Sequence, residues 1–376
     1  MALGKHSREK ERGGMRRWVI GASTLILGVA AVAFIVISRP HSPAASASTS
    51  KPPPPLTVVR TTPTGTNVNG ASIIAVQFST ALAPRSPMPT LSPALPGRWA
   101  VLSPTLLQYE ATEPLVPGAT EAITAPGGTG GMVGSRGQHL AASVTTSFTV
   151  APGSTLRLQQ MLAELGYLPL TFTAASPLTS PTQEGAPQTG AFTWRWPDQP
   201  ASLTSLWTPG TYNVITKGAV MNFESQHGLK VDGVAGAAVW GAVLQALESA
   251  QDDALPYDYV YVSQVLPESA TVYENGAAVY HTVVNTGIAA APTADGTFPV
   301  YARYTVTTMS GTNPDGSHYD DPGIRWVSYY NGGDALHAFP RASYGFPQSL
   351  GCVEMPLASA AAVFPLTPLG TLVTVS

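Results

Sequence analysis

The sequence predicts a mainly β, multidomain chain that begins with a membrane-spanning helix and contains one small helical module. Only 11% of the 376 residues are charged, and 36 glycines and 35 prolines favour strands joined by turns. A run from Trp18 to Ile37 contains no charge and no proline. Apolar residues recur at helical spacing within residues 154–250, in contrast to the strand-like patterns before and after that stretch.

The N-terminal residues predict on which side of the membrane each part of the chain lies. Residues 1–17 are basic and read as a cytoplasmic segment, and residues 18–38 read as a transmembrane anchor. At about 1.5 Å per residue, a helix over this run crosses a hydrocarbon core of about 30 Å. The basic flank predicts a single-pass membrane protein with a cytoplasmic N-terminus and an exported remainder. The alternative is secretion after signal cleavage near Ala45-Ser46-Ala47, which exports the same remainder.

The composition of the chain argues against nucleic-acid binding and against a metal site. The net charge of −3 and the lack of a basic patch interleaved with aromatic residues argue against a nucleic-acid partner. A single cysteine cannot form an internal disulfide, and its spacing from the histidines does not match a zinc site. We therefore expect no metal and no cofactor. The sequence does not indicate an oligomeric state.

Two segments follow the anchor. Residues 39–55 are rich in Pro, Ser and Ala and predict an extended linker. Residues 56–150 predict an all-β domain, whose strand-like segments are separated by Gly- and Pro-containing turns: 73–78, 106–109 and 144–150. Short segments of this domain resemble bacterial immunoglobulin-like surface domains: 76–79, 97–99, 117–118 and 147–149. The resemblance implies a β-sandwich spacer without chemistry of its own.

Residues 154–250 predict three short helices around one core. Ser154 is placed to cap the first helix, which Gly166 ends, the second starts at Thr216, and the third starts at about Ala237. Three segments resemble the peptidoglycan-binding three-helix domain: 158–167, 219–229 and 231–240. That resemblance implies binding to the glycan wall. An insertion at about 170–212 is either a long loop or a small hairpin, and its tryptophans either pack on the module or contact sugar or peptide: Trp194, Trp196 and Trp207.

The only cysteine, Cys352, follows His337 by fifteen positions. A thiolate is the reactive form of cysteine, and an imidazole within hydrogen-bond reach can take the thiol proton. The residues before the cysteine, Ser349, Leu350 and Gly351, predict a tight turn whose backbone N–H groups surround an oxyanion. The simpler alternatives are a small buried cysteine and a structural histidine.

Residues 257–376 predict consecutive strands, with Asn275-Gly276 as a two-residue hairpin turn. Together with three further segments, 292–300, 335–337 and 349–355, and a closing strand at 369–375, this order resembles the L,D-transpeptidase catalytic domain. The resemblance implies that Cys352 attacks a stem tetrapeptide of peptidoglycan and releases its terminal D-alanine, with His337 as the base. The acyl group then passes to a side-chain amine of a neighbouring stem peptide. The resemblance also implies that carbapenems acylate the thiol of Cys352.

Two positions depart from the family pattern, which usually has His at the place of Leu350 and Arg or Asn at the place of Glu354. We expect Arg341 or Arg325 to supply the missing cation, and His318 to be a further substrate contact. The departures keep open a catalytically silent, wall-binding scaffold. A second alternative is an L,D-carboxypeptidase with the same Cys–His pair, in which water is the acceptor.

Overall fold

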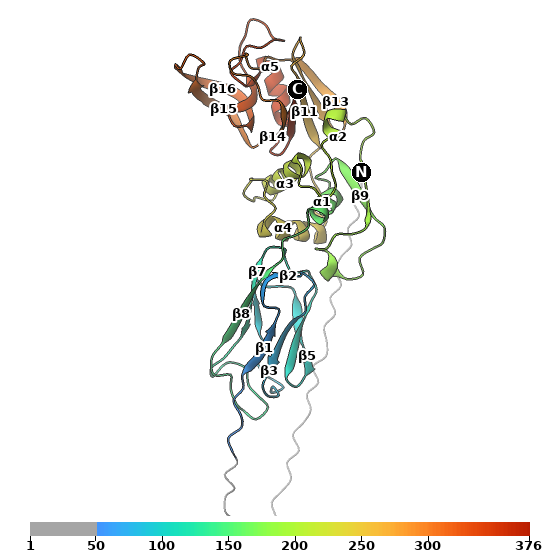
Figure 1. Cartoon of the computed structure of the whole chain (residues 1–376), viewed down its shortest axis with the longest axis vertical. Coiled ribbons are helices and arrows are strands. Elements are labelled where there is room, and N and C mark those ends of the chain that lie inside the picture. Colours follow the sequence, from blue (N-terminus) through green and yellow to red (C-terminus); the bar gives the residue numbers. More distant parts are fainter. Residues whose placement is uncertain (1–50) are drawn as a thin grey trace, which may run out of the picture. The chain divides into compact units, whose positions relative to one another are not determined.

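The structure is a computed structural model that describes residues 51–376 (Figure 1). The predicted cytoplasmic segment 1–17 and the anchor 18–38 lie outside the described residues, as does the linker up to residue 50. Within residues 51–376, no helix is both long and apolar enough to cross a membrane. Residues Pro52–Ser376 form one compact unit. The described part is mainly β, with a helical region in its middle.

The first β domain consists of two four-stranded sheets. One sheet is antiparallel and has the order β1-β3-β6-β5: Val58–Thr62, Ile74–Phe78, Leu106–Ala111 and Gly97–Ser103. The other has the order β2-β8-β7-β4: Gly65–Val68, Val144–Val150, Thr120–Ala125 and Thr90–Ser92. The strands predicted at 73–78, 106–109 and 144–150 are thus confirmed.

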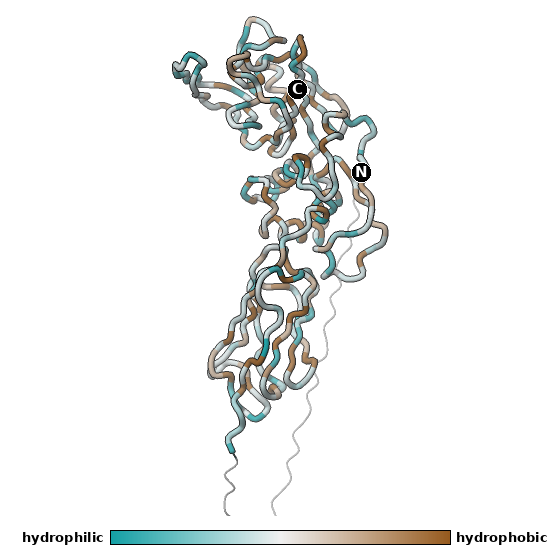
Figure 2. The backbone as a smooth tube through the Cα atoms, in the orientation of Figure 1, coloured by the Kyte–Doolittle hydropathy of each residue, from teal (hydrophilic) through white to brown (hydrophobic). Residues whose placement is uncertain are grey.

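Alternating side chains explain how this domain closes. Along β3 every second residue is buried, as expected for a strand with one face on a core. Figure 2 shows hydrophobic and hydrophilic stretches interspersed along the backbone of this domain. Phe78 from one sheet and Phe148 from the other belong to the same buried cluster. The domain is therefore a two-layer β-sandwich in which the sheets share one core. Its likeness to immunoglobulin-like domains stays a prediction.

The helical module contains three main helices, α1 (Thr155–Glu164), α3 (Val214–Gln226) and α4 (Ala237–Glu248). As predicted, α1 follows Ser154 and ends before Gly166, which has a positive φ of 85°. The second helix begins two residues before the predicted Thr216. The reason is Asn213, whose side chain accepts a hydrogen bond from the Thr216 N–H at 2.9 Å and so acts as the N-cap.

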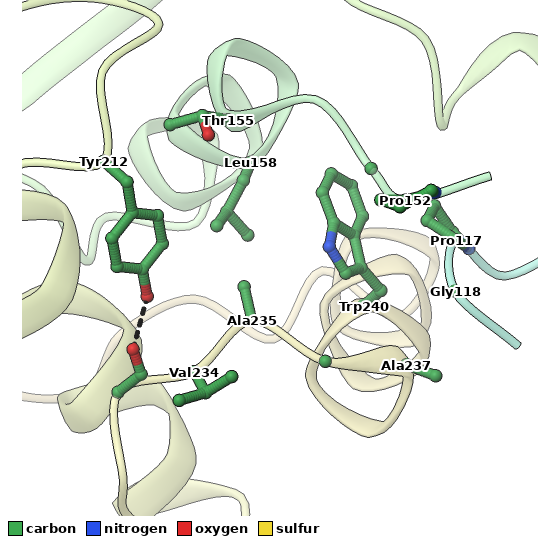
Figure 3. Close-up of a pocket in the computed structure, with 13 residues that line it drawn as sticks. Pro117, Gly118, Pro152, Thr155, Leu158, Tyr212, Val234, Ala235, Ala237 and Trp240 are labelled. Atoms are coloured by element: carbon green, nitrogen blue, oxygen red, sulfur yellow. Dashed lines mark hydrogen bonds between the residues drawn. The ribbon is translucent and has the colours of Figure 1, made fainter.

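The insertion at about 170–212 is a hairpin rather than a long loop. It contains four short elements: β9 (Leu170–Ala174), the 3₁₀ turn η1 (Pro181–Gln183), β10 (Gly190–Trp194) and α2 (Ala201–Thr204). The strands β9 and β10 pair antiparallel and form a sheet of their own. At the end of the insertion, the Tyr212 hydroxyl donates a hydrogen bond to the Gly233 carbonyl at 2.6 Å, close to the buried Trp240 (Figure 3). This bond ties the start of α3 to the loop before α4.

The third part of the chain has two sheets. The five-stranded sheet has the order β13-β12-β11-β19-β14: Ala277–Val283, Ser269–Glu274, Asp258–Ser263, Leu372–Val375 and Gly296–Pro299. The four-stranded sheet has the order β15-β16-β17-β18: Ala302–Thr312, His318–Asn331, Asp334–Ala338 and Val353–Met355. Helix α5 (Leu357–Val363) and the 3₁₀ turn η2 (Phe364–Leu366) follow β18.

Residues from both sheets and from α5 share one buried cluster, which includes Val262, Leu336 and Ala360. The predicted hairpin turn is confirmed, because Asn275 and Gly276 both have positive φ, 51° and 82°, as a type I′ turn requires. The closing strand is also confirmed: β19 pairs parallel to β11 and antiparallel to β14, in the middle of the sheet. The C-terminal residues therefore complete the core of this domain.

The two caps allow a matched test of helix stability. We expect Asn213→Ala to lower the free energy of unfolding of the helical module by about 1–2 kcal/mol, because α3 loses its side-chain cap. Ser154→Ala should cost less, since the Ser154 side chain makes no cap hydrogen bond. Hydrogen exchange of the first-turn amides of α3 measures the difference. Equal loss of protection in α1 and α3 would contradict this assignment.

Candidate active site

The predicted base lies on one strand, and the predicted nucleophile immediately precedes the neighbouring strand. β17 and β18 pair parallel, with Leu336 opposite Val353 and His337 opposite Glu354. Cys352 immediately precedes β18, and both Cys352 and His337 line one cavity of about 400 Å³. The stretch between them in sequence, apart from the last residue of β17, belongs to the connection between these two strands. The structure thus brings the two predicted residues to one site.

The environment of Cys352 keeps its thiol protonated. The side chain is half-buried, and its Sγ donates a hydrogen bond to the Gly333 carbonyl at 3.6 Å. Burial raises the pKa of the thiol to about 12, with further contributions in the same direction from the carboxylates of Asp334 and Glu354. At neutral pH the thiol therefore depends on a neighbouring base to become a nucleophile.

His337 is arranged as a neutral imidazole. Its side chain is only 3% exposed, and burial lowers the pKa of the ring below its usual value of 6.5. Nδ1 lies 3.0 Å from the Ala338 carbonyl oxygen, which can only accept, so Nδ1 carries the proton. A backbone carbonyl thus orients the ring. In this tautomer Nε2 keeps its lone pair and can accept a proton.

The turn before Cys352 is held by internal hydrogen bonds. The Ser349 hydroxyl donates to the Cys352 carbonyl at 2.5 Å and accepts from the Gly351 N–H at 3.2 Å. Ser349 N–H donates to the Thr286 carbonyl at 2.9 Å. Two of the three predicted oxyanion donors, Ser349 and Gly351, are therefore already engaged within the protein. In the part of the chain that the structure describes, the N–H groups of Leu350 and Cys352 have no protein acceptor.

Gly351 adopts a conformation that only glycine tolerates. Its φ is 113°, and a Cβ at this position would lie 2.6 Å from Oδ1 of Asp334. Asp334 itself lines the cavity and accepts a hydrogen bond from the Asn331 side chain at 3.3 Å. The glycine therefore lets the turn approach the start of β17 closely, which sets the position of the next residue, Cys352.

Arg341 and Glu354 form a bidentate ion pair on the cavity wall. The Nε and one terminal nitrogen of Arg341 each lie 2.8 Å from a Glu354 oxygen. The Glu354 side chain is 5% exposed and that of Arg341 30%. The guanidinium also donates to the Gln348 carbonyl at 3.2 Å and lies over the Phe339 ring. The charge that the sequence leads us to expect at the site is thus present, but it is neutralised by Glu354.

The other predicted substrate contacts lie elsewhere. Arg325 is exposed on β16 and His318 is exposed at the start of that strand, and neither lines the cavity. Leu350 is 36% exposed at the cavity. Among residues 51–376, no group of three His, Cys, Asp or Glu side chains is arranged to hold a metal.

The β15–β16 hairpin and the start of β17 contribute cavity residues that sequence reasoning missed. These include Tyr319, Asp321 and Asp334. The signal for the first two is their i, i+2 spacing, which places neighbouring side chains on one face of a strand. Nothing in the sequence indicated that this face turns toward the cysteine.

Comparison with known families supports the assignment of two regions. Residues 258–375 match the family model of the L,D-transpeptidase catalytic domain, and residues 203–243 match that of a peptidoglycan binding domain. None of the curated proteins compared with the chain matches it.

Several solved structures are similar to the chain. An L,D-transpeptidase from Mycobacterium smegmatis is 13% identical, with 86% of this chain and 100% of that one covered and a TM-score of 0.29. L,D-transpeptidase 3 from Mycobacterium tuberculosis, with a faropenem-derived adduct, is 13% identical, with 85% and 97% covered and a TM-score of 0.30. The catalytic domain of an E. faecium L,D-transpeptidase is 24% identical, with 33% and 100% covered and a TM-score of 0.30. Because these TM-scores are low, the assignment depends on the match of the sequence to the domain models. The chain therefore carries an L,D-transpeptidase catalytic domain together with a peptidoglycan-binding domain.

Proposed function

We propose that this protein is a cell-wall L,D-transpeptidase in which Cys352 is the nucleophile and His337 the general base. The observation that carries the proposal is the shared cavity: a neutral imidazole on β17 and a protonated thiol immediately before the paired strand β18 both line it. The match of residues 258–375 to the catalytic-domain model gives the reaction class. We place the catalytic part on the outer side of the membrane, at the cell wall.

The reaction proceeds in two half-reactions. His337 Nε2 takes the thiol proton as Sγ attacks the carbonyl carbon of the L,D peptide bond in a stem tetrapeptide. The imidazolium then gives this proton to the departing nitrogen of D-alanine, which leaves a thioester on Cys352. In the second half, a neutral side-chain amine of another stem peptide attacks the thioester. His337 Nε2 takes a proton from the attacking nitrogen and gives it to the leaving Sγ, so the thiol is regenerated as the amide cross-link forms.

We assign the oxyanion site to the backbone N–H groups of Leu350 and Cys352. Neither has an acceptor among residues 51–376, whereas those of Ser349 and Gly351 are engaged. Donors fixed in a turn need no reorganisation when negative charge develops on the carbonyl oxygen. A backbone donor at position 350 does not depend on the side chain, so leucine can stand there without loss of this interaction.

The charges around the cavity favour an amine over water as the acceptor. Asp321 and Asp334 place carboxylates on the wall, while the cation of Arg341 is paired with Glu354. A cationic amine is attracted to such a wall, whereas water gains nothing from it. This observation favours cross-linking over the carboxypeptidase alternative.

Carbapenem acylation tests the nucleophile and the base. We expect imipenem to add its own mass to the full chain once, at Cys352, and we expect no adduct on Cys352→Ala. His337→Ala should slow acylation by at least about 100-fold, since the base is lost. His281→Ala is the matched control, because His281 is exposed on β13, outside the cavity. Intact-protein mass spectrometry over time measures all four proteins.

Three outcomes would contradict the proposal. A parent chain that forms no imipenem adduct and does not cross-link stem peptides would favour the catalytically silent scaffold. An adduct on Cys352→Ala, or cross-linking by this variant at the parental rate, would mean that another group is the nucleophile. Release of D-alanine from a tetrapeptide donor without any dimer, even with an amine acceptor in excess, would favour the carboxypeptidase.

The pH dependence of acylation follows from the two pKa shifts. Since the pKa of His337 lies below 6.5 and that of Cys352 is about 12, the thiol–imidazole form predominates between these values. We expect the imipenem acylation rate to stay constant between about pH 7 and pH 9, and to fall only at acidic pH, where His337 is protonated. Stopped-flow kinetics measure the imipenem acylation rate at each pH. A rate that rises tenfold per pH unit across this range would mean that free thiolate, rather than the base-assisted thiol, reacts.

We further propose that Arg341 supports the cavity wall rather than binding a substrate anion. Arg341→Ala leaves a buried carboxylate without its cation and should lower the free energy of unfolding of the catalytic domain by about 3 kcal/mol. Glu354→Gln should cost less, since Arg341 is partly hydrated, and the double variant should be more stable than Arg341→Ala alone. Urea dependence of hydrogen exchange in β17 and β18 measures these differences, with the exposed Arg325→Ala as control. A rise in donor KM with unchanged stability would show a substrate contact instead.

A further inference from the structure

The hairpin inserted into the helical module has one aromatic face. In the β9–β10 register, Phe172 lies opposite Phe192 and Leu170 opposite Trp194. Directly paired residues, and residues two apart on one strand, share a face of a sheet. These four apolar side chains therefore lie on one side of the hairpin, and threonines such as Thr171 lie on the other.

The aromatic face continues beyond the hairpin onto Trp207. The Phe172 and Phe192 rings are 5.1 Å apart, and the Phe192 and Trp207 rings are 5.2 Å apart in an edge-to-face contact. Together with Trp194, these residues line a cavity of about 690 Å³. That volume lies within the range of small-molecule and ligand sites.

Packing alone does not account for this face. Leu170 on the same face is 1% exposed, as expected for a residue that only closes the core. The four aromatic side chains, by contrast, are only half-buried, although they also pack against the core of the module. Part of each of these side chains is therefore exposed, and all four line the cavity.

The cavity contains polar groups but no charge among its lining residues. The buried Gln160 side chain bonds both backbone polar groups of Gln188, at 2.7 and 3.0 Å, which fixes the segment leading into β10 as a second wall. Thr189 is exposed beside it, and Gln188 is partly exposed. The site therefore offers ring faces together with uncharged donors and acceptors.

We propose that this cavity binds the glycan strand of peptidoglycan by stacking sugar rings on Trp194, Phe172 and Trp207. A pyranose ring has one face of C–H groups that pack on an aromatic ring, and its hydroxyl and acetamido groups need uncharged hydrogen-bond partners. Stem peptides carry carboxylates and amines, for which this cavity has no counter-charge. The inference rests on the proposed function, and it assigns glycan to the helical module and stem peptide to the catalytic cavity.

The peptidoglycan-binding match covers only part of this site. It spans residues 203–243 and so includes Trp207, but it leaves out both strands of the hairpin. The insertion thus extends the module with an aromatic wall of its own, and the hairpin residues are the ones to vary in a test.

The experiment uses the full chain with Cys352→Ala, which cannot turn over substrate, and two probes. A hexamer of N-acetylglucosamine supplies the neutral sugar rings, and a free stem tetrapeptide supplies the charges. We expect the hexamer to bind in calorimetry and Trp194→Ala to weaken this binding at least fivefold. Trp194→Phe should retain most of it. Trp99→Ala is the matched control, because Trp99 is a half-buried tryptophan in the first β domain.

The outcomes separate this inference from the proposed function. Equal binding of the hexamer to the parent, Trp194→Ala and Phe172→Ala proteins, or binding of the tetrapeptide in place of the hexamer, would overturn the glycan site. Trp194→Ala in the chain that retains Cys352 should still form the imipenem adduct at the parental rate. Loss of that adduct together with an unchanged melting temperature would show that Trp194 serves the catalytic domain instead. Unchanged melting temperature with selective loss of the hexamer supports the proposal.

Discussion

The parallel pairing of β17 with β18 is the constraint on which the candidate active site depends. Its register sets His337 opposite Glu354, so Cys352, one residue before the strand, lies next to the histidine strand. A shift of register by one residue would turn the side chains of β18 to the opposite face. The pairing is supported on both sides: β17 continues into the four-stranded sheet through β16, and Asn285 bonds both backbone groups of Glu354 at 3.0 and 2.9 Å.

The same pairing explains the electrostatics of the site. β17 lies between β16 and β18 in its sheet, and His337 on it is buried. Burial disfavours the charged forms of both the imidazole and the thiol. The resting pair is therefore neutral. The cation on the cavity wall, Arg341, forms an ion pair with Glu354. Glu354 lies opposite His337 in the pairing of β17 with β18.

Local features were the ones that the sequence predicted well. The Asn275-Gly276 turn and the end of α1 at Gly166 depend on the backbone preferences of one or two residues. The start of α3 was placed two residues late, because Asn213 and Thr216 are both capable caps and only the hydrogen bond distinguishes them. The cavity walls depend on long-range pairing, which residue spacing does not reveal. For that reason Tyr319 and Asp334 were missed, and Ser349 and Gly351 were predicted as donors although their N–H groups bond within the protein.

The two departures from the family pattern have local explanations in the structure. Leu350 contributes a backbone N–H, which any residue other than proline supplies, and its side chain is partly exposed. Glu354 is buried, yet it is matched by Arg341 in a bidentate pair, so it does not leave an uncompensated charge beside Cys352. Gly351 is the position in this turn where a substitution is strained, since its φ of 113° is one that other residues rarely adopt and a Cβ would lie 2.6 Å from Oδ1 of Asp334. The chemistry therefore depends on the shape of the turn more than on the side chains at 350 and 354, and this is why we favour an active transpeptidase over a silent scaffold.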